Sequence, residues 1–330
     1  MLEKIKVSIP ERIYERLCRD AREFLILKPS GKENLNALIN RIVTNFYEEF
    51  SLDDAELREN VKRALSSIPE KYAREAFPEV MNAIAKRERE ETTGRKVAIS
   101  FKPTRTTESI FLYIENVLIH EESISSFYRR LFIAYAKKGK SDREKIIHKE
   151  VYSVLKEAME KELQVCVSLN NDQIYNESSL YAIEPAKDEF FNYVLLVSAG
   201  KNRTLRLAKI KTAMLLTKPS EVPQSSRALF DRQIACGAQY PIYDTFNEPI
   251  RVSLTEKGKA LFEKIYLYRP IPISIEGDVY TFDCSPYHVI YYFERFGAEA
   301  LILSPKKHGI FMRNYYYFAL KKYRSIYGKD

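Results

Sequence analysis

The first fifty residues combine one alternating segment with two amphipathic segments of helical period. Ile5, Val7 and Ile9 alternate with polar residues, which is typical of a strand with one apolar face. Pro10 suits the first turn of a helix, and apolar residues then recur at helical spacing as far as residue 27. A second helical pattern begins at about Asn34. Residues 1–50 are therefore predicted to form strand, helix, turn and helix.

The same order of elements recurs over residues 96–140, where an alternating segment and Pro103 precede two further helical patterns. The last helices of the two copies share the spacing of Leu38, Arg41, Ile42 and Phe46 with Phe127, Arg130, Leu131 and Tyr135. We interpret the two copies as an internal repeat. Each has the layout of a ribbon-helix-helix unit. A single such strand cannot bury its apolar face alone, so we expect the two strands to pair antiparallel within the chain.

The segments that flank the second copy are predicted to be helical. Residues 51–95 form a helical insert whose start is marked by an apparent capping box, Ser51-Leu-Asp-Asp54. Residues 141–163 form a connector helix that begins at a second capping box, Ser141-Asp-Arg-Glu144. One side of the connector is apolar and carries Ile147, Val151, Leu155 and Met159.

Beyond residue 163 the pattern changes from helical to strand-like. Short alternating segments separated by polar turns predict a small β-barrel over residues 164–248. Residues 249–330 alternate strand and helix in the order βαββαβ, with strands at Ile250–Leu254, near Ile271–Ile275, at Val279–Phe282 and at Ala300–Leu303. This order is typical of a ferredoxin-like arrangement, and a final amphipathic helix follows from about Gly309 to Tyr323. The predicted fold class is α+β.

Composition limits the compartment and the partner. The formal net charge is +8 and the isoelectric point is about 9.0, which favours a polyanionic partner. The four cysteines show no CxxC spacing, so neither a zinc site nor a disulfide framework is expected. No apolar run is long enough for a membrane span, and the chain starts without an apolar signal core. A cytoplasmic protein without a membrane partner is expected.

The search for catalytic motifs is negative. Gly139-Lys140-Ser141 imitates the end of a phosphate-binding loop, but Ala134 stands where the first glycine is required. The four histidines, His120, His148, His288 and His308, are far apart and have no acidic partner at ligand spacing. We therefore expect no catalytic residue, no metal and no cofactor.

One segment of the predicted barrel is strongly basic. Between residues 201 and 218 the chain has no acidic residue and six cations: Lys201, Arg203, Arg206, Lys209, Lys211 and Lys218. Because Leu205 and Leu207 flank Arg206, this arginine is predicted to point away from the barrel core. Lys209 and Lys211 would join it only if a bulge near Ala208 shifted the register. Such a face would form a groove for a phosphate backbone; the alternative is an ordinary charged outer face.

Two further surfaces are candidates for binding. The predicted ribbon carries polar residues on one face (Lys4, Lys6, Ser8, Lys96, Ser100 and Lys102), which could enter the major groove of a duplex or serve assembly alone. The cluster Tyr315-Tyr316-Tyr317-Phe318 on the last helix cannot face one core in full. Because interfaces favour aromatic residues, we expect part of this cluster to form a dimer contact.

The barrel segment resembles a WYL domain. The likeness rests on Ile183-Glu-Pro185, Phe191-Asn-Tyr193-Val194 and Leu205-Arg206-Leu-Ala-Lys209-Ile210, where Asn192-Tyr193-Val194 stands in place of the Trp-Tyr-Leu triplet. The resemblance implies an Sm-like (SH3-like) barrel, with Tyr193, Arg206 and Lys209 at ligand-facing positions.

The chain after residue 95 is most similar to ribbon-helix-helix/WYL accessory proteins of type VI CRISPR systems. That likeness lies in Leu254-Thr-Glu-Lys-Gly258, Tyr292-Phe293, Phe296-Gly297 and Ile302-Leu-Ser-Pro305. It implies a homodimer that binds single-stranded RNA in support of an RNA-guided RNase. Other WYL proteins are DNA-binding transcription regulators, so a regulator whose barrel senses a nucleotide or oligonucleotide is the alternative, and a metal-independent nuclease is the third hypothesis.

Overall fold

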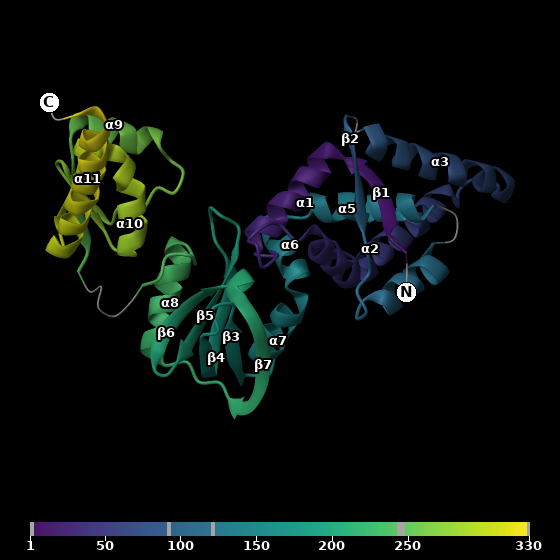
Figure 1. Ribbon diagram of the computed structural model, residues 1–330, viewed down its shortest axis with the longest axis horizontal. Coiled ribbons are helices and arrows are strands. Elements are labelled where there is room, and N and C mark those ends of the chain that lie inside the picture. Colours follow the sequence, from purple (N-terminus) through teal and green to yellow (C-terminus); the bar gives the residue numbers. More distant parts are fainter. Residues whose placement is uncertain (1–2, 91–93, 120–122, 243–247, 329–330) are drawn as a thin grey trace. The chain divides into compact units, whose positions relative to one another are not determined.

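Helices and small antiparallel sheets alternate along the chain (Figure 1), so the protein is α+β, as predicted. The computed structural model describes residues 3–90, 94–119, 123–242 and 248–328. It divides into two units, Met1–Glu150 and Val151–Asp330. Within the described residues, none of the helices has both the length and the apolar character needed to cross a bilayer.

The first unit is built around a two-stranded ribbon. Strand β1 (Ile5–Pro10) pairs antiparallel with β2 (Lys96–Phe101), which confirms the predicted pairing within the chain. Val7 lies opposite Ile99, and both are buried because the apolar face of the ribbon packs on helices. The helices of the first unit are α1 (Glu11–Glu23), α2 (Leu35–Leu65), α3 (Glu70–Glu90), α4 (Glu108–Tyr113) with its π-helical continuation Ile114–Leu118, α5 (Ile124–Lys137) and α6 (Lys140–Ile147).

The corresponding helices of the predicted repeat, α2 and α5, pack against each other. The rings of Phe46 and Tyr135, which occupy equivalent positions in the repeat, have centroids 6.4 Å apart. Phe50, one turn beyond Phe46 on α2, makes an edge-to-face contact with Phe127 of α5, with ring centroids 5.4 Å apart. The apolar spacing that the two helices share in sequence therefore marks their contact in the core.

The predicted boundary at residue 50 is not an element boundary, because α2 continues without interruption to Leu65. The interpretation of Ser51–Asp54 as a capping box was therefore wrong. Ser51 lies inside the helix, and its hydroxyl is buried without a hydrogen-bond partner. Asp54 instead binds Arg58 and Arg130 through its carboxylate. The chain contains no glycine or proline between residues 35 and 65 that would end the helix.

The predicted connector helix is two helices. The first, α6, begins at Lys140 after Gly139, without a side-chain cap, and ends before His148. The second, α7 (Lys149–Glu160), starts a new helical phase. As a result Val151 and Leu155 are buried as expected, whereas Met159 is exposed and Ala158 takes its place in the core.

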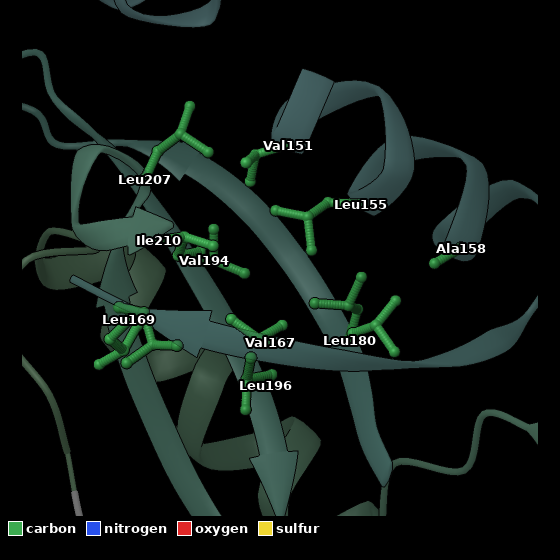
Figure 2. Packing of buried hydrophobic residues seen from close by; sticks show 12 residues of the cluster. Val151, Leu155, Ala158, Val167, Leu169, Leu180, Val194, Leu196, Leu207 and Ile210 are labelled. Carbon is green, nitrogen blue, oxygen red and sulfur yellow. The ribbon is translucent and has the colours of Figure 1, made fainter. Parts of the chain in front are cut away.

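A five-stranded antiparallel sheet forms the start of the second unit. Its strands are β3 (Leu163–Leu169), β4 (Ile174–Pro185), β5 (Asn192–Ser198), β6 (Lys201–Arg206) and β7 (Ile210–Pro219), in the spatial order β6-β5-β4-β3-β7. A 3-10 turn, Leu207–Lys209, joins the two edge strands. Figure 2 shows Val151 and Leu155 of α7 packed toward Val167, Leu180 and other apolar residues of the sheet.

The other face of this sheet is covered by α8 (Gln224–Cys236), a helix that was not predicted from the sequence. Phe230 of α8 is buried with Leu195 and Val197 of β5, and it stacks on Tyr181 at 5.3 Å. The helix was missed because its apolar residues are few and it follows a long strand pattern.

The C-terminal part of the second unit has the predicted element order. Its elements are β8 (Ile250–Leu254), α9 (Glu256–Lys264), β9 (Ser274–Glu276), β10 (Val279–Phe282), α10 (Pro286–Phe293), a 3-10 segment (Glu294–Glu299), β11 (Ala300–Ser304) and α11 (Lys306–Tyr327). The antiparallel sheet has the order β11-β8-β10-β9. The strand expected near Ile271–Ile275 is shorter and later, since only residues 274–276 pair with β10.

Aromatic rings and one glycine hold this part together. Phe262 of α9 stacks on Phe293 of α10 with ring centroids 6.0 Å apart, above the buried Phe282 of the sheet. A side chain at Gly258 would place its Cβ 2.2 Å from the carbonyl oxygen of Glu299. The glycine of the Leu254–Gly258 motif is thus required for close packing of α9.

Candidate nucleic-acid interface

The basic segment of the second unit runs along both edges of the five-stranded sheet. Lys201, Arg203 and Arg206 lie on β6, whereas Lys211 and Lys218 lie on β7, at the opposite edge. Lys209 is exposed on the 3-10 turn between them. The six cations are therefore close in sequence but divided between the two edge strands and the turn that joins them.

Arg206 is the centre of an aromatic cluster on one face of the sheet. Arg206 and Tyr193 are register partners on β6 and β5, so their side chains leave the sheet on the same side. The Arg206 guanidinium carbon lies 3.4 Å from the centroid of the Phe191 ring. Tyr193 donates a hydrogen bond of 3.1 Å to Glu189. A cation held flat against an aromatic ring beside a tyrosine can contact both a phosphate and a base.

Arg203 lies on the opposite face of β6, because it is three residues from Arg206. Its guanidinium carbon is 5.5 Å from the centroid of the Tyr175 ring. The Nε atom of Arg203 is buried without a hydrogen-bond partner. The stretch thus provides a second arginine on an aromatic ring, directed away from the first.

Lys209 and Lys211 do not lie on one strand face with Arg206, so the condition for a single basic face is not met. A 3-10 turn, in which Leu207 and Ala208 are buried, stands where a bulge near Ala208 would have been needed. The Lys211 ammonium binds the Asp172 carboxylate at 3.2 Å. Lys218 forms an ion pair with Glu177. The acids missing from the segment itself are thus supplied by β4 and by the turn that precedes it.

The polar face of the ribbon is exposed on the first unit. Lys6 is paired with Ser100 and Ser8 with Ala98 across the two strands, and Lys96 is exposed at the end of β2. Lys4 and Lys102 flank the strands and are also exposed. Asn36 accepts a 2.8 Å hydrogen bond from the backbone N–H of Lys102, and Arg129 donates one of 2.6 Å to the carbonyl of Ser8. The two strands therefore hold this polar row at a fixed spacing.

The histidines take structural positions where the chain is described, and His120 lies outside the described residues. Nε2 of His148 is 3.1 Å from the carbonyl of Phe24, and Nε2 of His288 is 2.9 Å from the carbonyl of Tyr268. Burial lowers the pKa of both His288 and His308. In residues 3–90, 94–119, 123–242 and 248–328 there is no group of three or more His, Cys, Asp or Glu side chains that could hold a metal.

A tyrosine-lined pocket of about 550 Å³ lies beside Tyr193 and was not predicted from the sequence. It is lined by Glu189, Tyr193, Gln239, Tyr240, Pro241, Tyr268, Tyr287, Tyr291, Tyr292 and Arg295. The four-residue spacing of Tyr287 and Tyr291 on α10 was the available signal. Burial raises the pKa of Tyr240 and of Tyr292 to about 12, so both hydroxyls remain protonated at neutral pH.

Two of the four cysteines meet in space although they are 48 positions apart in sequence. Cys236 ends α8, and Cys284 precedes α10. A hydrogen bond from the Cys284 thiol, helped by Lys187 and Arg232, lowers the pKa of Cys236 to about 7. The same contact and burial raise the pKa of Cys284. Arg232 also forms an ion pair with Asp283, which holds the two segments together.

Comparison with known proteins identifies the fold more clearly than the family. No family model matches the chain, and no curated protein matches it. Among solved structures, one described as a CRISPR Cas-related protein matches with a TM-score of 0.65 and 18% identity, over 99% of this chain and 95% of that chain. The two chains therefore share a fold along nearly their whole length.

A second solved structure is the proteasome accessory factor B/C (PafBC) of Arthrobacter aurescens. It matches with a TM-score of 0.27 and 11% identity, over 68% of this chain and 39% of that chain. This likeness is too weak to indicate a shared fold.

Proposed function

We propose that this protein is a non-enzymatic, single-stranded-RNA-binding accessory of an RNA-guided CRISPR RNase. The observation that carries the proposal is the cluster of Arg206, Phe191 and Tyr193, which places a cation beside two half-buried aromatic rings on one face of a small antiparallel sheet. Basic grooves with aromatic side chains are the usual means of holding unpaired strands. The full-length likeness to a CRISPR Cas-related protein supports the CRISPR association.

The proposed subdomains follow the topology of the sheets. Four strands in sequence order and a fifth that returns beside the first, after a 3-10 turn, agree with an Sm-like (SH3-like) WYL barrel at residues 164–248. The order β11-β8-β10-β9, all antiparallel, agrees with a ferredoxin-like part at residues 249–330. The intrachain ribbon and its helices agree with ribbon-helix-helix-like repeats in the first unit.

We propose further that the protein acts in the cytoplasm as a homodimer joined through α11. Of the cluster on this helix, Tyr316 donates a 3.0 Å hydrogen bond to the carbonyl of Glu294, whereas Tyr315, Tyr317 and Phe318 are exposed. An exposed aromatic row of this kind is typical of a surface that binds another protein.

The second candidate function is a DNA-binding transcription regulator. It is favoured by the exposed polar row on β1 and β2, because a two-stranded ribbon can enter the major groove. Lysine and serine alone provide few bidentate base contacts, which weighs against this candidate.

Titration of fluorescently labelled single-stranded RNA, single-stranded DNA and duplex DNA by anisotropy at two salt concentrations tests the proposal. We expect salt-dependent binding of single-stranded RNA and much weaker binding of the duplex. Preference for the duplex would support the regulator instead. Cleavage of labelled RNA by the protein alone, with or without magnesium, would overturn the non-enzymatic role.

A further inference from the structure

The geometry points to the tyrosine-lined pocket as a binding site for one nucleotide, with an unpaired purine base inserted among the tyrosines. This inference rests in part on the proposed function, because it supplies the base-reading site that a single-strand-binding surface requires. The same chemistry could come from a nucleotide within an RNA strand or from a free mononucleotide. The experiment below separates these two sources.

The size and lining of the pocket suit a flat aromatic ligand. Its volume of about 550 Å³ lies within the range of roughly 300–1,000 Å³ that is usual for small-molecule sites. Six of its lining residues are tyrosines. Tyr240 stacks face to face on His288, with centroids 4.2 Å apart and planes within 6°. This ring is thus held rigidly where it borders the pocket, and fixed aromatic planes favour stacking of a base.

Gln239 provides the polar group that a base edge requires. Its Nε2 and Oε1 atoms are buried and make no hydrogen bond of normal geometry, although the amide interacts with the neighbouring Tyr240 hydroxyl. A buried amide with unused hydrogen-bonding capacity costs about 1–3 kcal/mol, so a ligand that bonds to it would be favoured. A side-chain amide offers one donor and one acceptor side by side, the combination with which glutamine recognises adenine.

Charged groups at the edge of the pocket suit the rest of a nucleotide. Arg295 is exposed and donates one 3.0 Å hydrogen bond, from Nε to the carbonyl of Tyr292. Its guanidinium can therefore bind a phosphate from the solvent side. Glu189, which accepts a hydrogen bond from Tyr193, is exposed and can accept another from a ribose hydroxyl.

The backbone beside the pocket also carries strain. Tyr268 has a φ of +62°, which is unusual for a residue other than glycine. Its carbonyl is held by His288 at 2.9 Å. Strained backbone positions that the surrounding structure holds in place cluster at ligand sites, and Tyr268 lines the pocket.

The test uses the full chain and two probes. The first is AMP, titrated by calorimetry with ribose 5-phosphate as the comparison ligand. The second is a single-stranded RNA with one 2-aminopurine among uridines, whose fluorescence falls when the base stacks. We compare Gln239→Leu and Tyr291→Ala with Tyr72→Ala, a matched control because Tyr72 is exposed on α3 and does not line the pocket.

Whichever probe the wild type binds, we expect the two pocket variants to bind it with an affinity lower by roughly 5- to 150-fold. The control variant is expected to bind it with unchanged affinity. Gln239→Leu is expected to unfold no earlier than the wild type on heating, because it removes a buried amide with unused hydrogen-bonding capacity. This separates loss of binding from loss of folding.

The outcomes distinguish this inference from the proposed function. If the 2-aminopurine fluorescence is quenched and the pocket variants abolish this quenching, the pocket binds a nucleotide within an RNA strand. If the protein binds AMP but not RNA, the pocket binds a free nucleotide and the proposed function is overturned. RNA binding with unchanged 2-aminopurine fluorescence and no AMP binding overturns the pocket alone. If neither probe binds, both proposals fail.

Discussion

Tyr193 and Arg206 face each other across β5 and β6, and the Arg206 guanidinium lies on the Phe191 ring at 3.4 Å. This relationship fixes a positive charge on the sheet face that carries Tyr193. A flexible lysine at the same place would lose rotamer freedom on binding a phosphate, whereas an arginine stacked on a ring is already ordered.

The first prediction concerns this charge. Arg206→Gln is expected to weaken binding of single-stranded RNA about 3- to 10-fold and to reduce the slope of log K against log salt by about 0.7, because one phosphate contact is lost. Lys211→Gln is the matched control, since the Lys211 ammonium already binds Asp172 at 3.2 Å. Anisotropy titrations at several salt concentrations measure both slopes. Equal slopes for the two variants would contradict a special role of Arg206.

The second prediction concerns a buried ion pair in the first unit. Arg143 donates hydrogen bonds to both carboxylate oxygens of Asp20, at 2.8 and 3.1 Å, and both side chains are almost fully buried. Burial raises the pKa of Tyr135, so its hydroxyl stays protonated and donates to Asp20 at 3.0 Å. Asp20→Asn leaves a buried arginine without its counter-charge and is expected to destabilise the unit by about 3–5 kcal/mol.

Urea unfolding followed by circular dichroism measures this loss. Glu70→Gln is the control, because it removes the carboxylate of an exposed ion pair with Arg74, and such pairs are worth at most about 1 kcal/mol. A similar shift of the unfolding midpoint for both variants would show that the Asp20–Arg143 pair contributes no more to stability than an exposed ion pair.

Local patterns in the sequence predicted the ribbon and the C-terminal element order because each depends on neighbouring residues. The alternation of Val7 and Ile9 with polar residues is itself the cause of a one-sided strand, and the strand pairs as expected. The capping interpretation of Ser51 failed because Asp54 finds partners in Arg58 and in Arg130 of a distant helix, and tertiary contacts override a local motif.

The candidate site was predictable only in part for the same reason. Arg206 was identified because Leu205 and Leu207 flank it, a local relationship. The pairing of Lys211 with Asp172 depends on the register of strands far apart in sequence. The pocket combines residues from 189 to 295, and nothing in the sequence near Gln239 indicates that its amide would be buried.

The third prediction follows from His288. Burial lowers its pKa, opposed by the hydrogen bond to the Tyr268 carbonyl and by Asp188, while Lys187 adds to the lowering. The unfolded chain therefore binds a proton at a higher pH than the folded chain does. Stability is unaffected by this group above the ordinary histidine pKa of about 6.5 and is lost as the pH falls below it toward the folded value.

Thermal unfolding of the wild type and of His288→Gln between pH 5 and pH 8 tests this. The difference in midpoint between the two proteins should narrow or reverse as the pH falls below about 6.5. A difference that stays constant over this range would show that His288 does not titrate in the way its burial predicts.

The fourth prediction concerns the cysteine pair. Because its pKa is lowered to about 7, Cys236 is expected to react with iodoacetamide at pH 7 faster than an ordinary exposed cysteine. Cys284, whose pKa is raised, should react slowly. Mass spectrometry of timed samples measures both rates. Because the Cys284 thiol supplies the hydrogen bond, Cys284→Ala should slow the reaction of Cys236, while Cys166→Ala should not. An unchanged rate in Cys284→Ala would contradict the proposed contact.

The fifth prediction concerns dimerisation through α11. This helix exposes a row of aromatic side chains and carries no acidic residue, and Met312 is its one fully buried residue within the described chain. Phe318→Asp places a charge in that row at a side chain that is 62% exposed, so the fold of the monomer should tolerate it. If the row joins two copies, the variant should sediment as a monomer at concentrations where the wild type is a dimer.

Leu52→Asp, at an exposed apolar residue of α2, is the control and should leave the dimer intact. A wild type that sediments as a monomer at all concentrations, or a Phe318→Asp protein that remains dimeric, would rule out α11 as the dimer contact.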